Sequence, residues 1–140
     1  MAVEDLTVGQ SAESTKTVTQ KDIEMFAEVS GDHNPVHLDA AFAAATPFKG
    51  IIAHGMLSAS FISAILGTTL PGQGTIYMGQ NLRFLAPVRP GDTVRTVITV
   101  KEIHLEKRRV ICQTQCYVGE TQVIDGEATL LVPSGQPRKT

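Results

Sequence analysis

Two side chains that can move protons stand five positions apart in the stretch VSGDHNPVH, at Asp32 and His37. A carboxylate and an imidazole held close together can share a proton and activate a water molecule, which is general acid–base chemistry. Between and beside them, Gly31 can end a helix in the left-handed conformation, Asn34 can bond its own backbone, and Pro35 cannot continue a helix. We therefore expect an ordered loop that holds both side chains in a fixed arrangement.

Two other interpretations of this segment stay open. A purely structural loop is one of them, because Asp and Asn are common turn formers. A metal site is the other, since Asp32, His33, His37 and His54 all carry possible ligand atoms, but their spacing matches no zinc signature. We expect no metal and no cofactor. His54 can assist the acid–base pair, or it can be a buried imidazole that bonds to the backbone.

The length and charge of the chain set the class of protein. With 140 residues it can form one domain with a sizeable core, and we expect residues 1–140 to be that domain, with 134–140 as a polar tail. The formal net charge of −2 gives no reason to expect nucleic acid as a partner. Hydrophobic residues make up 42% and charged residues 19%, a balance that favours surface buried in an oligomer.

The sequence predicts neither export nor membrane insertion. The first ten residues contain two acidic side chains and no apolar run, so they do not form a signal peptide. The longest apolar stretch, 50–70, is interrupted by His54 and by several Ser, Thr and Gly, which favours a buried helix. We expect a cytoplasmic protein without a membrane partner. Cys112 and Cys116, four positions apart in a strand-like segment, are expected to be reduced core residues.

Periodicity and capping signals predict three helices. The first covers 20–30, with Thr19 as its N-cap and Asp22 at its third position, where the helix dipole favours a carboxylate. A short alanine-rich helix is expected over 40–45. The third helix covers 57–67 and carries no charged side chain, so we expect protein to surround it on all sides.

The remaining pattern is that of β-structure. Alternating Val, Ile and Thr, with Pro and Gly turns between the runs, predict a short first strand and four long ones, over 14–18, 75–84, 93–104, 108–118 and 122–132. Because the helices precede four consecutive strands, the order predicts an α+β fold in which one long central helix packs across an antiparallel sheet.

Three stretches match a known family pattern in the right order: FAEVSGDHNPVHLDAAFA over 26–43, AHGM over 53–56, and NLRF over 81–84 followed by Pro-Val and Pro-Gly-Asp. On these stretches the chain resembles the R-specific enoyl-CoA hydratases, also called hydratase 2 or MaoC-like hydratases, of the hot-dog fold. The resemblance covers residues 6–132. The chain length is similar to that of single hot-dog members, including those that feed polyhydroxyalkanoate synthesis, rather than the double hot-dog eukaryotic ones.

The resemblance implies a hydro-lyase of fatty-acid metabolism. It would reversibly add water to a trans-2-enoyl-CoA and form an (R)-3-hydroxyacyl-CoA, with no cofactor beyond the CoA of the substrate. Asp32 and His37 would activate the water and Asn34 would support the loop. The amide of Gly55 would hold the thioester oxygen, because a helix N-terminus offers unpaired N–H groups and a favourable dipole. The open strand edges favour a homodimer.

Four further residues are expected at the substrate. Ser63 and Leu66, one turn apart on the long helix, and Leu131 on the last strand would line an acyl pocket, where the two bulky leucines favour short chains. Arg83 would contact a CoA phosphate. The alternatives are core packing for the first three residues and a surface salt bridge for Arg83.

Three other functions are compatible with such a chain: a hot-dog thioesterase, an acyl-carrier-protein dehydratase, and a non-catalytic acyl-CoA-binding module. The Asp-x-Asn-Pro-x-His motif argues against the first two, since thioesterases of this fold usually carry a lone acid without that histidine. Thiol release would indicate hydrolysis, and loss of the enoyl absorbance would indicate hydration. Tight binding without water addition would indicate the binding module.

Overall fold

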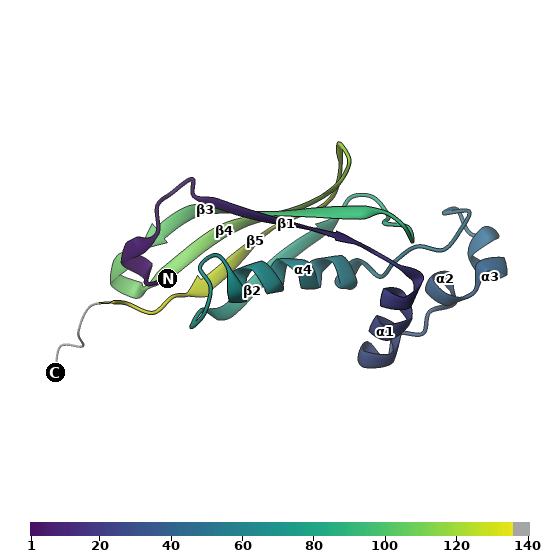
Figure 1. Cartoon of the computed structure of the whole chain (residues 1–140), viewed down its shortest axis with the longest axis horizontal. Coiled ribbons are helices and arrows are strands. Elements are labelled where there is room, and N and C mark those ends of the chain that lie inside the picture. Colours follow the sequence, from purple (N-terminus) through teal and green to yellow (C-terminus); the bar gives the residue numbers. More distant parts are fainter. Residues whose placement is uncertain (136–140) are drawn as a thin grey trace.

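One antiparallel sheet of five strands, with a long helix along one face, makes up most of the molecule (Figure 1). The computed structural model describes residues 1–135, so 136–140 of the expected polar tail lie outside the described residues. The spatial order of the strands is β1-β3-β4-β5-β2, with β1 and β2 at the two edges. Figure 1 shows α4 lying along the sheet and the three shorter helices gathered beyond one end of it.

The bounds of the elements agree closely with the sequence pattern. The helices are α1 (Gln20–Ser30), α2 (Pro35–Leu38), α3 (Ala40–Ala44) and α4 (Gly55–Thr68), with 3-10 turns at Val3–Asp5 and Leu105–Lys107. The strands are β1 (Ser11–Thr17), β2 (Ile76–Phe84), β3 (Thr93–His104), β4 (Arg109–Val118) and β5 (Thr121–Leu131). The predicted α+β architecture, with a long helix across an antiparallel sheet, is confirmed. Among the described residues, no helix has the length and hydropathy that crossing a membrane requires.

The face of the sheet that meets α4 forms the core. On β4, Val110, Cys112, Thr114 and Cys116 alternate toward this face and are all fully buried, as a half-buried strand requires. Both cysteines are free thiols, as expected, and burial raises the pKa of Cys112 to about 12. These thiols therefore remain protonated and serve as small apolar side chains.

Helix α4 differs from the prediction in one respect. Its buried face packs on the sheet through Leu57, Ser58, Ile62, Ile65 and Leu66. The opposite face is open to solvent within one chain, because a single sheet covers only one side of a helix. This open face consists mainly of a methionine and small residues: Met56, Ser60, Ser63, Ala64 and Gly67.

Helix α1 begins and ends as the sequence predicts. The Thr19 side chain accepts a hydrogen bond from the Asp22 amide at 3.1 Å, and the Asp22 carboxylate accepts one from the Thr19 amide at 3.0 Å. These bonds form a capping box, and they lower the pKa of Asp22, with a smaller contribution from Lys16. Gly31 ends the helix with φ of 81°, in the left-handed region. The helix therefore delivers the chain into the 32–37 segment at a defined angle.

The 32–37 segment is not a simple loop, because Pro35 begins the short helix α2. We expected proline to exclude a helix here, but at the first helical position its missing N–H is not needed and its fixed φ suits the helix. The Asn34 side chain caps this helix by accepting a hydrogen bond from the Val36 amide at 3.2 Å. His37 is therefore placed by a helical turn rather than by a loop.

The capping box on α1 provides a test of the fold. Replacing Thr19 by Ala removes the acceptor for the Asp22 amide, and we expect this to lower the free energy of unfolding by about 1 kcal/mol. Urea denaturation followed by circular dichroism measures the change. Lys21→Ala, at an exposed position of the same helix, is the control and should change it by less than about 0.5 kcal/mol. Equal stability of Thr19→Ala and wild type would contradict the capping role.

Candidate active site

Three side chains from the ends of three helices meet at one point. Asp32 follows the end of α1, His37 lies in α2, and His54 is the N-cap residue of α4. Each contributes an atom to a cluster whose members all lie within 4.8 Å of one another. The two histidines are buried, whereas Asp32 is exposed. Asp32 and His37, which the sequence suggests as an acid–base pair, therefore lie close together in space, and His54 lies beside them.

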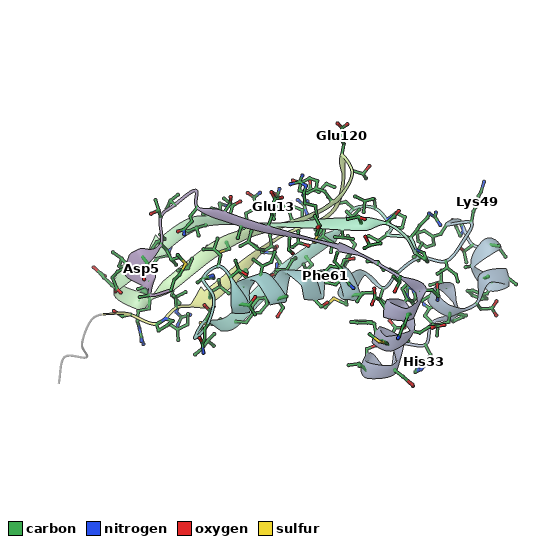
Figure 2. The ribbon with its side chains drawn as sticks, viewed as in Figure 1. Asp5, Glu13, His33, Lys49, Phe61 and Glu120 are labelled. Carbon is green, nitrogen blue, oxygen red and sulfur yellow. The ribbon has the colours of Figure 1, made fainter. Side chains whose placement is uncertain are left out.

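The backbone around Asp32 is tied down from both sides. Its amide donates a hydrogen bond to the Ser30 hydroxyl at 3.1 Å, and its carboxylate accepts one from the Asn34 amide at 3.2 Å. One carboxylate oxygen is thus used in the turn, and the exposed side chain retains acceptor capacity for a water molecule. Through its amide, which bonds to Asp32, and its side chain, which bonds to the Val36 amide, Asn34 connects the two parts of the 32–37 segment. His33, between Asp32 and Asn34, points into solvent (Figure 2).

The ring of His37 has a defined tautomer. Its Nδ1 lies 2.7 Å from the carbonyl oxygen of Ile52, and since a carbonyl only accepts, Nδ1 carries the proton. The other nitrogen, Nε2, then holds a lone pair, as a general base requires. The Ile52 carbonyl therefore fixes both the orientation and the basic atom of this imidazole.

The ring of His54 is held by three neighbours. Its Nε2 donates to the main-chain oxygen of Asp32 at 3.0 Å. One face stacks on His37, with ring centroids 3.8 Å apart and planes at 28°, and Phe26 lies at 4.8 Å and 52°. Burial lowers the pKa of His54, and the hydrogen bond to Asp32 acts in the opposite direction. With burial as the larger effect, the ring is neutral at pH 7.

Gly55 begins α4 directly after His54. The amide of a first helical residue has no partner within its own helix, so it is free to donate to a ligand. The Phe84 ring packs so closely that a Cβ atom at position 55 would lie 2.6 Å from it. Glycine is thus required for the present position of this ring.

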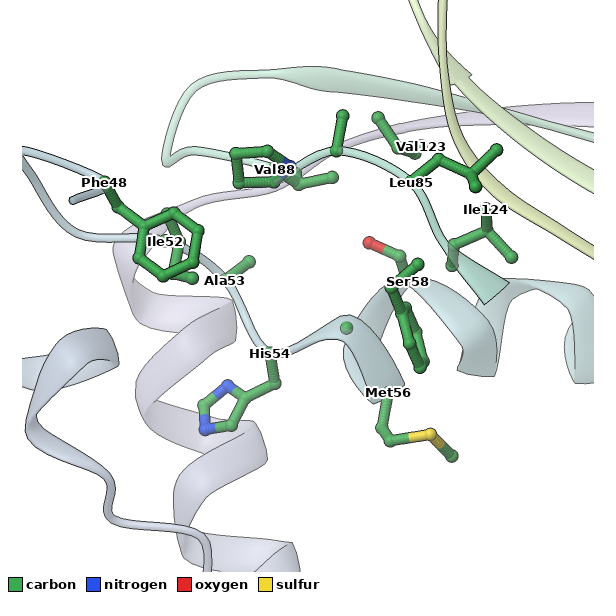
Figure 3. Close-up of a pocket in the computed structure, with 14 residues that line it drawn as sticks. Phe48, Ile52, Ala53, His54, Met56, Ser58, Leu85, Val88, Val123 and Ile124 are labelled. Atoms are coloured by element: carbon green, nitrogen blue, oxygen red, sulfur yellow. The ribbon is translucent and has the colours of Figure 1, made fainter. Parts of the chain in front are cut away.

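A cavity of about 380 Å³ opens beside the first turn of α4 (Figure 3). His54, Gly55 and Ser58 belong to its wall, and the rest of the wall is apolar, including Phe48, Val88 and other aliphatic side chains. The hydroxyl of Ser58 is buried and has no hydrogen-bond partner among the described residues. Figure 3 shows it directed from the helix toward the open space.

A second cavity, of about 450 Å³, lies between α4 and β2, and its wall includes Phe26, Met56, Ser63 and Tyr77. Neither Asp32 nor His37 belongs to the wall of either cavity. Met56, at the start of α4, belongs to the wall of both cavities, and His54, which contacts Asp32 and His37, belongs to the wall of the first.

The expected substrate contacts are distributed unevenly. Ser63 belongs to the wall of the second cavity. Leu66 is only 1% exposed and packs in the core, and Leu131 lies on β5. Neither leucine belongs to the wall of either cavity. For Leu66 the structure therefore shows the core packing that was the alternative, because the residue lies on the sheet side of α4. Arg83 is exposed and pairs with Asp125 at 3.2 Å, which is the surface salt bridge considered for it.

Among residues 1–135, metal binding has a geometric basis only in the cluster of Asp32, His37 and His54. Within it, Nδ1 of His37 and Nε2 of His54 already donate to carbonyl oxygens, so these two nitrogens are not available to an ion. The absence of a metal requirement stays a prediction.

An antiparallel sheet wrapped on one long helix, with an acid and a base at the start of that helix, defines a hot-dog protein equipped for proton transfer. The chain belongs to the MaoC-like family: the pattern described as "MaoC like domain" matches residues 5–126. It is 53% identical to the (R)-specific enoyl-CoA hydratase of Rhodospirillum rubrum over 94% of this chain and 91% of that protein.

Two solved structures share the fold throughout. The R-hydratase of Pseudomonas aeruginosa in its unliganded form has a TM-score of 0.90 and 47% identity, covering 99% of this chain and 92% of that one. The (R)-hydratase from A. caviae involved in PHA biosynthesis has a TM-score of 0.90 and 41% identity, covering 93% and 99%. The predicted family and the hot-dog fold are therefore confirmed. The roles of individual residues stay predictions.

The contacts of His54 cannot be predicted from the sequence alone. The sequence allowed it to assist the site, but its stacking on His37 and its bond to Asp32 depend on how α1, α2 and α4 pack. The signal that could have identified it is a histidine directly before the glycine that starts the long helix.

The lowered pKa of His54 predicts a pH dependence of stability. In the unfolded chain the His54 ring has the ordinary histidine pKa of about 6.5, and in the folded protein its pKa is lower. As the pH falls below about 6.5, the unfolded chain therefore binds a proton that the folded protein does not, and the free energy of unfolding decreases. His54→Gln lacks this titration and should lose less stability than wild type between pH 7 and pH 5. Denaturant unfolding at the two pH values measures the difference. Equal losses in both proteins would contradict a buried neutral ring.

Proposed function

We propose that this protein is an (R)-specific enoyl-CoA hydratase, a hydro-lyase that reversibly adds water to trans-2-enoyl-CoA and forms (R)-3-hydroxyacyl-CoA. The observation that carries the proposal is the meeting of Asp32 and His37 with the start of α4 through His54. The family membership and the activity of the R. rubrum relative support it. The proposal includes an acyl-CoA as the partner molecule, no cofactor, and a cytoplasmic location.

In this mechanism Asp32 and His37 act on one water molecule. The lone pair on Nε2 of His37 accepts a proton as the water oxygen bonds to C3, while the Asp32 carboxylate holds the water by a hydrogen bond. The C2–C3 double-bond electrons move toward the thioester carbonyl and form an enolate. A proton then passes from the pair to C2, which restores the thioester and completes the addition of H and OH.

Gly55 stabilises the negative charge that develops on the thioester oxygen. Its amide points outward from the N-terminus of a helix of 14 residues, where the helix dipole also favours negative charge. A donor placed in this way is worth about 3 to 4 kcal/mol of barrier. The lack of a side chain at position 55 lets the Phe84 ring pack against the start of α4, where both residues belong to the wall of the first cavity. Of the predicted substrate contacts, Ser63 in the wall of the second cavity, Leu131 and the exposed Arg83 stay in the proposal. Leu66 does not, because it packs in the core on the sheet side of α4.

The protein forms a homodimer in this proposal. The edge strand β2 presents Ile76, Tyr77 and Met78, which are 56%, 40% and 48% exposed. Met56 at the start of α4, which belongs to the same cavity wall as Tyr77, is 54% exposed. An edge strand also presents backbone N–H and C=O groups without strand partners, and pairing with a second copy would satisfy these groups and bury the apolar side chains. The pairing would also place protein near the open face of α4.

Two near-isosteric substitutions test the chemistry. Asp32→Asn and His37→Gln each remove a proton acceptor, and we expect each to lower kcat for crotonyl-CoA hydration by at least about 100-fold. Loss of the enoyl absorbance follows hydration, and a thiol reagent detects hydrolysis in parallel. His33→Gln, in the same segment but exposed, is the control and should retain activity.

Wild-type-like turnover in either folded variant would contradict the proposed catalytic roles of Asp32 and His37. Thiol release by the wild type, without hydration, would identify a thioesterase. Binding of crotonyl-CoA with neither reaction would identify a binding module.

The dimer is tested by mass in solution. Light scattering coupled to size exclusion should give twice the 15.0 kDa of one chain. Ile76→Glu places a charge on the edge strand and should shift the population toward monomer, because the carboxylate would lose its water on pairing. A monomeric wild type at micromolar concentration would contradict the proposal.

A further inference from the structure

We propose that His54 is a positioning residue that holds Asp32 and His37 in register with the start of α4. This inference rests on the proposed hydration. It assigns His54 a function distinct from chain packing: its ring acts through the two residues that handle the water.

The first contact fixes the acid. Nε2 of His54 donates to the main-chain oxygen of Asp32 at 3.0 Å, across 22 positions of sequence. His54 immediately precedes Gly55, so this bond ties the Asp32 backbone to the residue next to the proposed oxyanion donor. Without it, the exposed Asp32 segment depends on its local bonds to Ser30 and Asn34, which do not reach α4.

The second contact fixes the base. The ring of His54 stacks on the ring of His37 at 3.8 Å, while Phe26 supports it at 4.8 Å. The bond from Nδ1 of His37 to Ile52 sets the rotation of that imidazole, and the stacked ring limits its movement perpendicular to its plane. Both members of the acid–base pair therefore contact one ring, which Phe26 also contacts.

Packing alone does not explain a histidine at this position. The residue is 2% exposed, and Nδ1 of the ring is buried without a hydrogen-bond partner among the described residues. Leaving a buried acceptor unpaired lowers stability, so an apolar side chain of similar size would pack at lower cost. The hydrogen bond from Nε2–H to the main-chain oxygen of Asp32 offsets this loss of stability.

The tautomer also suits the proposed chemistry. A ring that donates through Nε2 and keeps Nδ1 unprotonated is neutral. Asp32, His33 and His37 are the titratable groups that contribute to its electrostatic environment. With His54 neutral, the adjacent His37 can take up a proton from water without facing a second positive charge in the stack.

Two substitutions of His54 distinguish the effect of its hydrogen-bond donor from the effect of its side-chain volume. His54→Leu keeps apolar volume but removes the N–H, whereas His54→Gln places an amide N–H near the position of Nε2. For crotonyl-CoA hydration we expect kcat to fall about 100-fold in His54→Leu and by less than about tenfold in His54→Gln, with KM within about threefold of wild type in both. Val110→Ala, in the core of β4, is the stability control and should leave kcat unchanged well below its unfolding midpoint.

Wild-type kcat in folded His54→Leu would overturn the positioning role, and so would a loss that appears only in KM. If His54→Leu does not fold, nitrogen NMR of the wild type decides, since the inference requires a neutral His54 ring protonated on Nε2 and a ring protonated on Nδ1 contradicts it. Absence of hydration by the wild type would instead overturn the proposed function, and the NMR result would still report on the contact with Asp32.

Discussion

The contact between the start of α4 and the segment after α1 is the constraint on which the site depends. It consists of one hydrogen bond from His54 to the Asp32 carbonyl and one ring stack from His54 to His37. In the proposed mechanism these interactions bring two kinds of chemistry together: proton transfer by the side chains of Asp32 and His37, and stabilisation of an anion by the amide at the start of α4. Neither part alone would hydrate a double bond conjugated to a thioester.

The fold supplies the rigidity that this contact needs. The sheet buries one face of α4 through aliphatic side chains, so the helix is packed against the strands along its length. At the other end of the contact, the capping box of α1 and the left-handed Gly31 set where Asp32 emerges. The open face of α4 and the apolar edge of β2 remain as the surfaces that a second copy would cover.

The elements governed by local rules could be predicted from the sequence. The capping box at Thr19, the end of α1 at Gly31 and the alternation on β4 depend on residues a few positions apart, and they occur where the pattern places them. The start of α2 at Pro35 was missed, because proline has opposite effects inside a helix and at its first position.

The site itself required the packing of distant segments. Asp32 and His37 could be recognised from their motif, but the stack with His54 joins residues from α2 and α4 and has no local signature. Similarly, the helical spacing of Ser63 and Leu66 does not reveal which side of α4 faces the sheet, and the structure places them on different sides.

The most direct test of the central claim is a crystal structure of Asp32→Asn with crotonyl-CoA bound. We expect the thioester oxygen about 3 Å from the Gly55 amide nitrogen, with C3 facing His37 and the substituted side chain at position 32. A thioester bound away from the start of α4, or a C3 atom turned away from His37, would contradict it.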